Sequence, residues 1–75
     1  MIIKFSRHAK RRANLYNIRE STIEEILKGC DLQDGEHDII KDVGGFQYPI
    51  KIVVSVEGDL LTVITTYPLK KGRRQ

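Results

Sequence analysis

The most regular hydrophobic pattern lies in the second half of the chain. Apolar side chains occupy every even position from 46 to 56, so a strand over these residues would carry all of them on one face. Lys51 projects from the opposite face of that predicted strand. Residues 60–67 are also β-rich, but they have apolar side chains on both faces, which is typical of an interior strand. The turn sequence Glu57-Gly58-Asp59 separates the two runs and predicts that they are neighbouring antiparallel strands.

The first half of the chain has helical periodicity. Ser6 is a suitable N-cap for a helix over residues 7–16. Ala9, Ala13 and Tyr16 fall on one stripe of this helix. Because the alanines are small, we expect the helix to lie close to the surface that it covers.

A second helix is predicted a few residues later, over about 21–28. Ser21 and Glu24 match a capping box in which the serine is the N-cap. Ile23 and Leu27 belong to its apolar stripe, and Gly29 stands where a C-terminal glycine is common.

Two weaker strand signals complete the predicted order. Residues 2–5 and 37–43 are the candidates, and Gly44-Gly45 predicts a two-residue hairpin turn after the second of them. Helices followed by strands are typical of an α+β domain. We therefore expect two N-terminal helices packed on one face of a three- to four-stranded antiparallel sheet. The short chain shows no linker, so a single domain over residues 1–75 is predicted, with a basic tail at about 69–75.

Charge is distributed unevenly along the chain. Residues 1–28 carry seven basic and three acidic side chains, residues 29–63 two and seven, and residues 64–75 four and none. The formal charges are thus +4, −5 and +4, which agree with the net charge of +3. If the fold brings the two basic ends together, they form a positive face that attracts a polyanion such as RNA. Ordinary solvated lysines and arginines would give the same counts, so charge alone leaves both interpretations open.

Several kinds of site are disfavoured by the sequence. His8, Cys30 and His37 lack the close spacing of zinc ligands, and the acidic residues do not match a calcium loop, so no metal is expected. Gly44-Gly45 lacks the residues that follow in a phosphate-binding loop, and no cofactor is expected. The chain has no apolar run long enough for a membrane helix and no apolar signal core, and it has a single cysteine. We therefore expect a cytoplasmic protein without a membrane partner.

His8 and Arg12 are the candidates for chemistry, since they lie one helical turn apart in the first predicted helix. An imidazole exchanges protons near neutral pH, and a guanidinium matches the geometry of phosphate oxygens. They form a minimal set for RNA cleavage without a metal, and Thr65, Thr66 and Tyr67 at the end of the last predicted strand could supply hydroxyls. From the chemistry alone, an ordinary surface histidine is the simpler interpretation.

The motifs at both ends of the chain resemble a known family. Residues 6–12, Ser-Arg-His-Ala-Lys-Arg-Arg, are followed by Ile18, Ile23 and Leu27, and residues 63–67 read Val-Ile-Thr-Thr-Tyr. This pattern is similar to the domain of unknown function 4258, which resembles RelE/ParE-type toxins and the barnase–EndoU–colicin–RelE group of metal-independent RNases. The resemblance implies a RelE-like fold and a small toxin–antitoxin ribonuclease that cleaves RNA by 2′-hydroxyl attack. It also implies two partners, namely free or ribosome-bound RNA and an antitoxin protein.

Carried onto this sequence, the resemblance implies a catalytic set of His8, Arg12, Thr65 and Tyr67. We expect six basic residues to contact the nucleic acid: Arg11, Lys51, Lys70, Lys71, Arg73 and Arg74.

The sequence departs from the family pattern at one place. An arginine followed by a glycine often precedes the loop isoleucine in the family, whereas Tyr16 and Asn17 stand here. If that arginine belongs to the site, Arg11 or Arg19 would have to substitute for it. Two other functions stay open, namely a non-catalytic RNA- or ribosome-binding module and a protein-interaction relative of the toxins.

Overall fold

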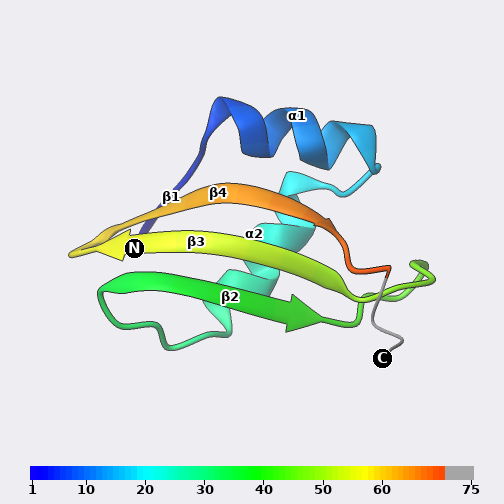
Figure 1. Cartoon of the computed structure of the whole chain (residues 1–75). Coiled ribbons are helices and arrows are strands. Elements are labelled where there is room, and N and C mark those ends of the chain that lie inside the picture. The colour runs from blue at the N-terminus through cyan, green and yellow to red at the C-terminus, as the bar shows by residue number, and fades with distance from the viewer. Residues whose placement is uncertain (71–75) are drawn as a thin grey trace.

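Two helices and a four-stranded sheet make up the fold in the structure, a computed structural model that describes residues 1–70 (Figure 1). In chain order the elements are β1 (Ile2–Phe5), α1 (Arg7–Leu15), α2 (Glu20–Lys28), β2 (Gly35–Lys41), β3 (Ile50–Glu57) and β4 (Leu60–Pro68). The strand order in the sheet is β1-β4-β3-β2. The last three strands of the chain form an antiparallel meander, and β1 lies beside β4 in parallel.

The predicted architecture is α+β like the observed fold but is wrong in two respects. The sheet is mixed rather than antiparallel, because β1 pairs with β4 in parallel. Tight turns set the relative direction of consecutive strands, but β1 and β4 are separated by both helices and two strands, so no local signal sets theirs. The helices also do not form one layer on one face. Helix α2 crosses behind the strands, whereas α1 runs along β4 at the β1 side of the sheet (Figure 1).

Helix α1 begins where the sequence predicts. Ser6 is the N-cap, and its Oγ accepts a hydrogen bond from the Ala9 N–H at 3.0 Å. Ala9 and Ala13 are buried, so the helix packs by its small side chains. It ends at Leu15, and Asn17 then adopts a φ of 58°, a left-handed conformation that asparagine tolerates better than most residues.

Helix α2 begins without the predicted capping box. Arg19 is the N-cap in place of Ser21, and no side chain caps the helix. Ile18 is buried just before it, and the Ile18 N–H donates to the Ala13 carbonyl at 2.8 Å. This anchored loop sets the entry of the chain into α2, so tertiary packing overrides the local capping signal. Gly29 is the C-cap, as predicted.

The two connections of the meander differ from each other. The predicted turn at Gly44-Gly45 forms, since the Phe46 N–H donates to the Val43 carbonyl at 3.1 Å. It does not join the strands directly as a two-residue hairpin, because β2 ends at Lys41 and β3 begins only at Ile50. Pro49 has no N–H to donate to the ladder, so pairing starts after it. The predicted turn between β3 and β4 is confirmed, with Gly58 at a φ of 61°.

The core lies between the sheet and the helices. It consists of Ala9, Ala13, Ile18, Ile23, Leu27, Ile50, Ile52, Val54, Val56, Leu61 and Val63. The even positions of β3 are buried, as the alternation predicts. One face of the sheet carries the even positions of β3 and lines the core. Within residues 1–70 neither helix covers the other face, which we call the open face (Figure 1). None of the helices in this part of the chain is long and apolar enough to cross a membrane.

Candidate functional site

The open face is defined by the residues that pair with the odd positions of β3. Directly paired residues of neighbouring strands project from the same side of a sheet. The members on β2, β3 and β4 are therefore Glu36, Asp38, Ile40, Lys51, Val53, Ser55, Thr62, Thr65 and Tyr67. Three candidate residues from the sequence lie on this one surface, namely Lys51 on β3 and Thr65 and Tyr67 on β4.

A β-bulge in β4 determines which of its side chains reach the open face. The register shifts between Val53 and Val54 of β3, so that Val53 pairs with Thr65 and Val54 pairs with Val63. Ile64 is thus the extra residue of the bulge. A bulge of this kind interrupts the alternation of side chains along its strand.

The bulge turns two predicted catalytic residues outward. Leu61, before the bulge, points into the core, and an unbroken alternation would bury Thr65 and Tyr67 in the same way. Instead, Thr66 is fully buried, and Thr65 and Tyr67 are half-buried on the open face. The Thr66 hydroxyl donates a hydrogen bond to the Lys51 carbonyl at 3.0 Å, so its burial leaves no unsatisfied donor.

The start of helix α1 is attached to this bulge. The Ser6 N–H donates to the Val63 carbonyl at 3.0 Å, and the Ser6 hydroxyl donates to the Ile64 carbonyl at 2.9 Å. The same hydroxyl oxygen is the N-cap acceptor of α1. Because His8 follows Ser6 by two residues and Thr65 follows Ile64 directly, this one side chain holds the first turn of α1 beside the bulged part of β4.

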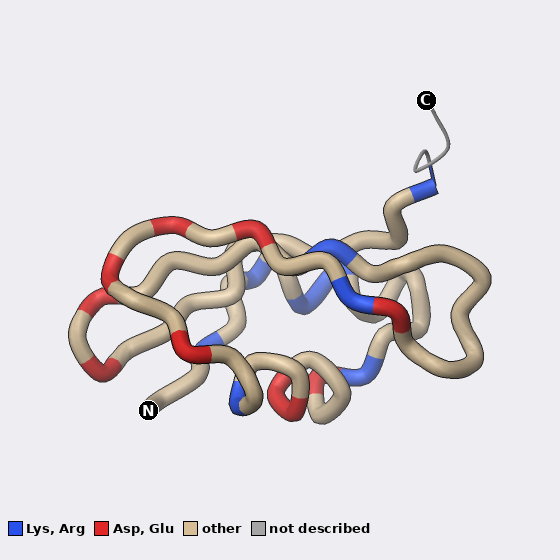
Figure 2. The backbone as a smooth tube through the Cα atoms, turned by 90° about the horizontal axis from the view of Figure 1, so that it is seen from below, with Lys and Arg blue, Asp and Glu red and all other residues tan. Residues whose placement is uncertain are grey.

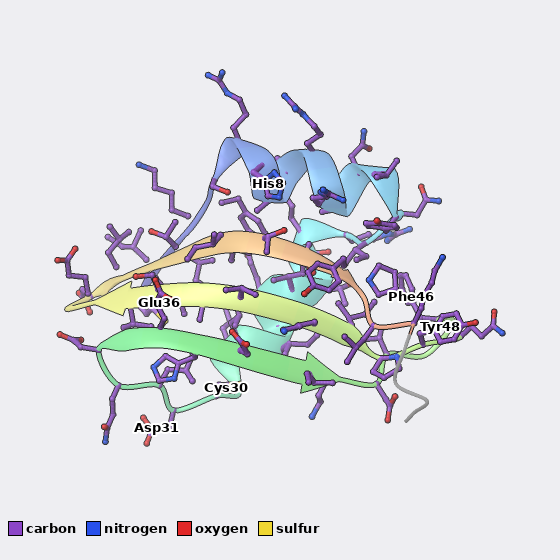
Figure 3. The ribbon with its side chains drawn as sticks, viewed as in Figure 1. His8, Cys30, Asp31, Glu36, Phe46 and Tyr48 are labelled. Atoms are coloured by element: carbon purple, nitrogen blue, oxygen red, sulfur yellow. The ribbon has the colours of Figure 1, made fainter. Side chains whose placement is uncertain are left out.

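His8 and Arg12 lie on the same flank of α1. They are separated by one helical turn, His8 is exposed, and Arg12 is half-buried. Figure 3 shows His8 on the side of α1 toward the viewer, which is also the side of the open face, while α2 lies behind the sheet. The exposed His8 side chain therefore borders the open face at its β4 side, and helical spacing puts Arg12 on the same flank of α1.

Lys51 is the cation at the centre of the open face. Its Nζ lies 3.4 Å from Asp38 Oδ2 and 5.9 Å from the centroid of the Tyr67 ring. The negative charge of an ionised Tyr67, followed by the hydrogen bond to the Asp38 carboxylate, raises the pKa of Lys51 above its ordinary 10.5. The ammonium is thus fully charged at neutral pH, between an aromatic ring and a carboxylate.

Basic side chains are exposed along α1, whereas acidic side chains gather at the end of the sheet where β2 begins and the β3–β4 turn lies. On α1, beside the β1–β4 edge, Arg7, Lys10 and Arg11 are exposed. Asp and Glu residues gather around β2, its preceding loop and the neighbouring β3–β4 turn (Figure 2). Asp34 connects these acidic segments, since its carboxylate accepts a hydrogen bond from the Gly58 N–H at 3.1 Å. A bound polyanion is therefore favoured at the α1 side and disfavoured at the acidic end of the sheet.

The remaining predicted phosphate contacts lie at the end of the chain. Lys70 is exposed, and Lys71, Arg73 and Arg74 lie outside the described residues. Arg11 is exposed on α1.

His37 and Cys30 lie away from this surface. His37 pairs with Val54, whose side chain is in the core, so His37 projects from the face opposite the open face. The Nε2 atom of His37 lies 2.6 Å from the Gln33 carbonyl oxygen. The Cys30 thiol donates to the Ile26 carbonyl at 3.3 Å. Across the part of the chain that the structure describes, no three His, Cys, Asp or Glu side chains gather as metal ligands.

Sequence reasoning missed two parts of this site. The sequence shows Asp38 only as one of several acidic residues between Asp31 and Asp42, and the strand register is needed to reveal it as the partner of Lys51. The bulge at Ile64 was also missed, because the apolar residues on both faces of β4 hide the change in alternation. The sequence indicates that Ser6 is an N-cap, but it does not indicate that the same hydroxyl also donates to the Ile64 carbonyl.

Comparison with known proteins identifies the family. A family model described as a domain of unknown function (DUF4258) matches residues 5–68. The chain belongs to this family. The DUF4258 match extends from the end of β1 to the end of β4, so it includes both helices, the meander and the bulge. No curated protein and no solved structure matches the chain.

Proposed function

We propose that this DUF4258 domain is a small ribonuclease of the toxin–antitoxin type, which cleaves RNA without a metal ion. The observation that carries the proposal is the attachment of α1 to the β4 bulge through Ser6. It holds the helix that bears His8 and Arg12 beside the segment that turns Thr65 and Tyr67 outward. The reaction class comes from the resemblance of the sequence motifs to RelE/ParE-type toxins and the barnase–EndoU–colicin–RelE group, from which the catalytic set was also taken. An antitoxin protein is the partner that such an activity requires.

The proposed reaction is a transesterification within the RNA, in which the 2′-oxygen replaces the 5′-oxygen on phosphorus. His8 accepts the proton of the 2′-hydroxyl, and the 2′-oxygen attacks phosphorus, so that a phosphorus–oxygen bond forms. Arg12 stabilises the negative charge that develops on the phosphoryl oxygens. The bond from phosphorus to the 5′-oxygen breaks, and the leaving oxygen takes a proton from the Tyr67 hydroxyl. The proton on His8 then passes to solvent and Tyr67 takes one from solvent, which restores both groups. The products are a 2′,3′-cyclic phosphate and a 5′-hydroxyl.

Thr65 is assigned a different task from Tyr67. Its hydroxyl lies on the open face between the bulge and Tyr67 and is a donor for a phosphoryl oxygen. In this role it orients the phosphate between the groups on α1 and those on β4, so its loss would weaken positioning rather than remove a proton carrier.

Binding of RNA without cleavage is the second candidate. The exposure of Arg7, Lys10 and Arg11 on α1 favours it, because phosphate contacts need only accessible cations. This candidate predicts salt-sensitive RNA binding and no products.

RNA cleavage in the presence of EDTA tests the proposal. We expect the wild type to release products ending in a 2′,3′-cyclic phosphate and to leave DNA of the same sequence intact. His8→Ala should reduce the rate by about 10²-fold or more, the usual contribution of a general base. His37→Gln is the matched control, because His37 lies away from the open face, and it should cut like the wild type.

Two results would contradict the proposal. Equal cleavage by the wild type and a folded His8→Ala variant would remove His8 from the mechanism. RNA binding with no product from the wild type would favour the second candidate.

A further inference from the structure

A row of side chains crosses the open face and is only partly used by the proposed reaction. Ile40 on β2, Lys51 on β3 and Tyr67 on β4 pair directly across three neighbouring strands. Asp38 lies on the same face of β2 and forms the ion pair with Lys51. Ile40 is 54% exposed, so its apolar surface is accessible to a ligand on this face.

The contacts of Lys51 are loose on both sides. Its 3.4 Å separation from Asp38 exceeds the roughly 2.7–2.9 Å of a strong charged hydrogen bond. The Lys51 side chain is 23% exposed and that of Asp38 is 57% exposed, so water reaches the pair and screens it. The 5.9 Å distance to the Tyr67 centroid lies at the outer limit of a cation–π contact of about 6 Å. The Lys51 ammonium therefore stays close to Tyr67 and Asp38 but can exchange the Asp38 carboxylate for another anion.

We propose that this row is a nucleotide-binding site for single-stranded RNA, in which Lys51 exchanges Asp38 for a phosphate and Tyr67 stacks on a base. This inference rests on the proposed function for its ligand, RNA, and adds the form of RNA that binds. When the ammonium moves to a phosphate, the ring face beside it becomes available for stacking. Ile40, on the other side of Lys51, offers apolar surface to a ribose or a second base.

The arrangement selects single strands for a geometric reason. Stacking on a protein ring requires a base whose faces are free, and the bases of a duplex already stack on one another. The row lies on the surface of a sheet, where a splayed single strand can lay a base on Tyr67. Asp38 competes with the phosphate for Lys51 and thereby weakens binding of ligands that offer no base to stack.

Fluorescence anisotropy with a 2′-O-methyl oligonucleotide measures this binding. The probe lacks the nucleophilic hydroxyl and is not cleaved, so binding is read independently of the reaction. We expect the single strand to bind the full chain at least about tenfold more tightly than the duplex of the same sequence. Lys51→Met should weaken single-strand binding about tenfold and reduce the slope of log affinity against log salt by about 0.7. Lys51→Arg should restore most of the affinity.

Two carboxylate variants isolate the role of Asp38. Asp38→Asn and Glu36→Gln each remove one negative charge from the same face of β2, but only Asp38 pairs with Lys51. Asp38→Asn should tighten single-strand binding about fivefold, the amount expected when a surface ion pair of ~1 kcal/mol no longer competes. Glu36→Gln should change binding less than twofold. In the Lys51→Met background the two carboxylate variants should have equal effects.

The binding and cleavage results together test the nucleotide site and the ribonuclease activity separately. Equal effects of Asp38→Asn and Glu36→Gln in the wild-type background, or equal binding of duplex and single strand, would overturn the nucleotide site even if RNA is cleaved. The expected binding pattern without cleavage would uphold the nucleotide site and contradict the ribonuclease. Thermal unfolding of every variant verifies that the binding differences come from folded protein.

Discussion

Removal of the Ser6 hydroxyl tests the connection between α1 and β4 in isolation. Ser6→Ala eliminates two hydrogen bonds at once, the N-cap acceptor for Ala9 and the donor to the Ile64 carbonyl. Loss of a serine cap costs about 1 kcal/mol, and loss of a partner for a part-buried carbonyl costs about another 1 kcal/mol. We therefore expect the free energy of unfolding to fall by ~2 kcal/mol. For a domain of this size, that corresponds to a decrease in Tm of about 8–16 °C.

Urea unfolding followed by circular dichroism measures the change, and Ser21 supplies the matched control. Ser21 matches the capping pattern in the sequence, but it is exposed and does not cap α2. Ser21→Ala should alter the free energy of unfolding by less than about 0.5 kcal/mol. Equal effects of the two substitutions, or a loss below about 0.5 kcal/mol for Ser6→Ala, would refute the claim that Ser6 anchors α1 to the bulge.

Three further predictions concern β3, β4 and the turn between them. Thr66→Val leaves the Lys51 carbonyl without its donor, and urea unfolding should show a loss of about 1–2 kcal/mol. Gly58→Ala forces a side chain to a φ of 61° and should cost about 1 kcal/mol in the same assay, whereas Gly44→Ala, which meets no atom within 4 Å, should be neutral. Because Tyr67 and the ion pair raise the pKa of Lys51 above 10.5, its contribution to stability is complete below pH 10.5 and is lost as pH rises through the folded-state pKa. An NMR titration of Lys51 should show this raised pKa, and Tyr67→Phe should move it back toward 10.5.

The parts of the fold that the sequence predicted correctly depend on local chemistry. Ser6 caps α1 because a hydroxyl before a helix satisfies a free N–H wherever the helix lies in the fold. The Gly58 turn forms because its positive φ suits glycine, and β3 buries its even positions because alternation is a property of the strand itself.

The errors concern features that distant parts of the chain determine. No local signal sets the direction of β1 relative to β4, and the start of α2 depends on the burial of Ile18 rather than on Ser21. The predicted turn at Gly44-Gly45 lies within an eight-residue connection between β2 and β3 instead of joining them directly, and Pro49 has no N–H to donate to the ladder before β3 begins.

The candidate site was predictable only as a set of residue types. His8, Arg12, Thr65 and Tyr67 were named for their chemistry and for the family motif, without a reason for them to share a side of the molecule. That reason is the bulge, whose extra residue Ile64 reverses the side-chain alternation and whose carbonyl binds the cap of α1. A bulge depends on the partner strand and on what its free carbonyl contacts, so a single strand sequence does not reveal it.

An NMR titration with the 2′-O-methyl single strand tests most directly whether α1 and the open face form one RNA-binding surface. We predict that the signals of His8, Thr65 and Lys51 shift together and yield one dissociation constant, while the His37 ring is unaffected. Shifts confined to either α1 or the sheet, or different dissociation constants for the two, would contradict a shared surface.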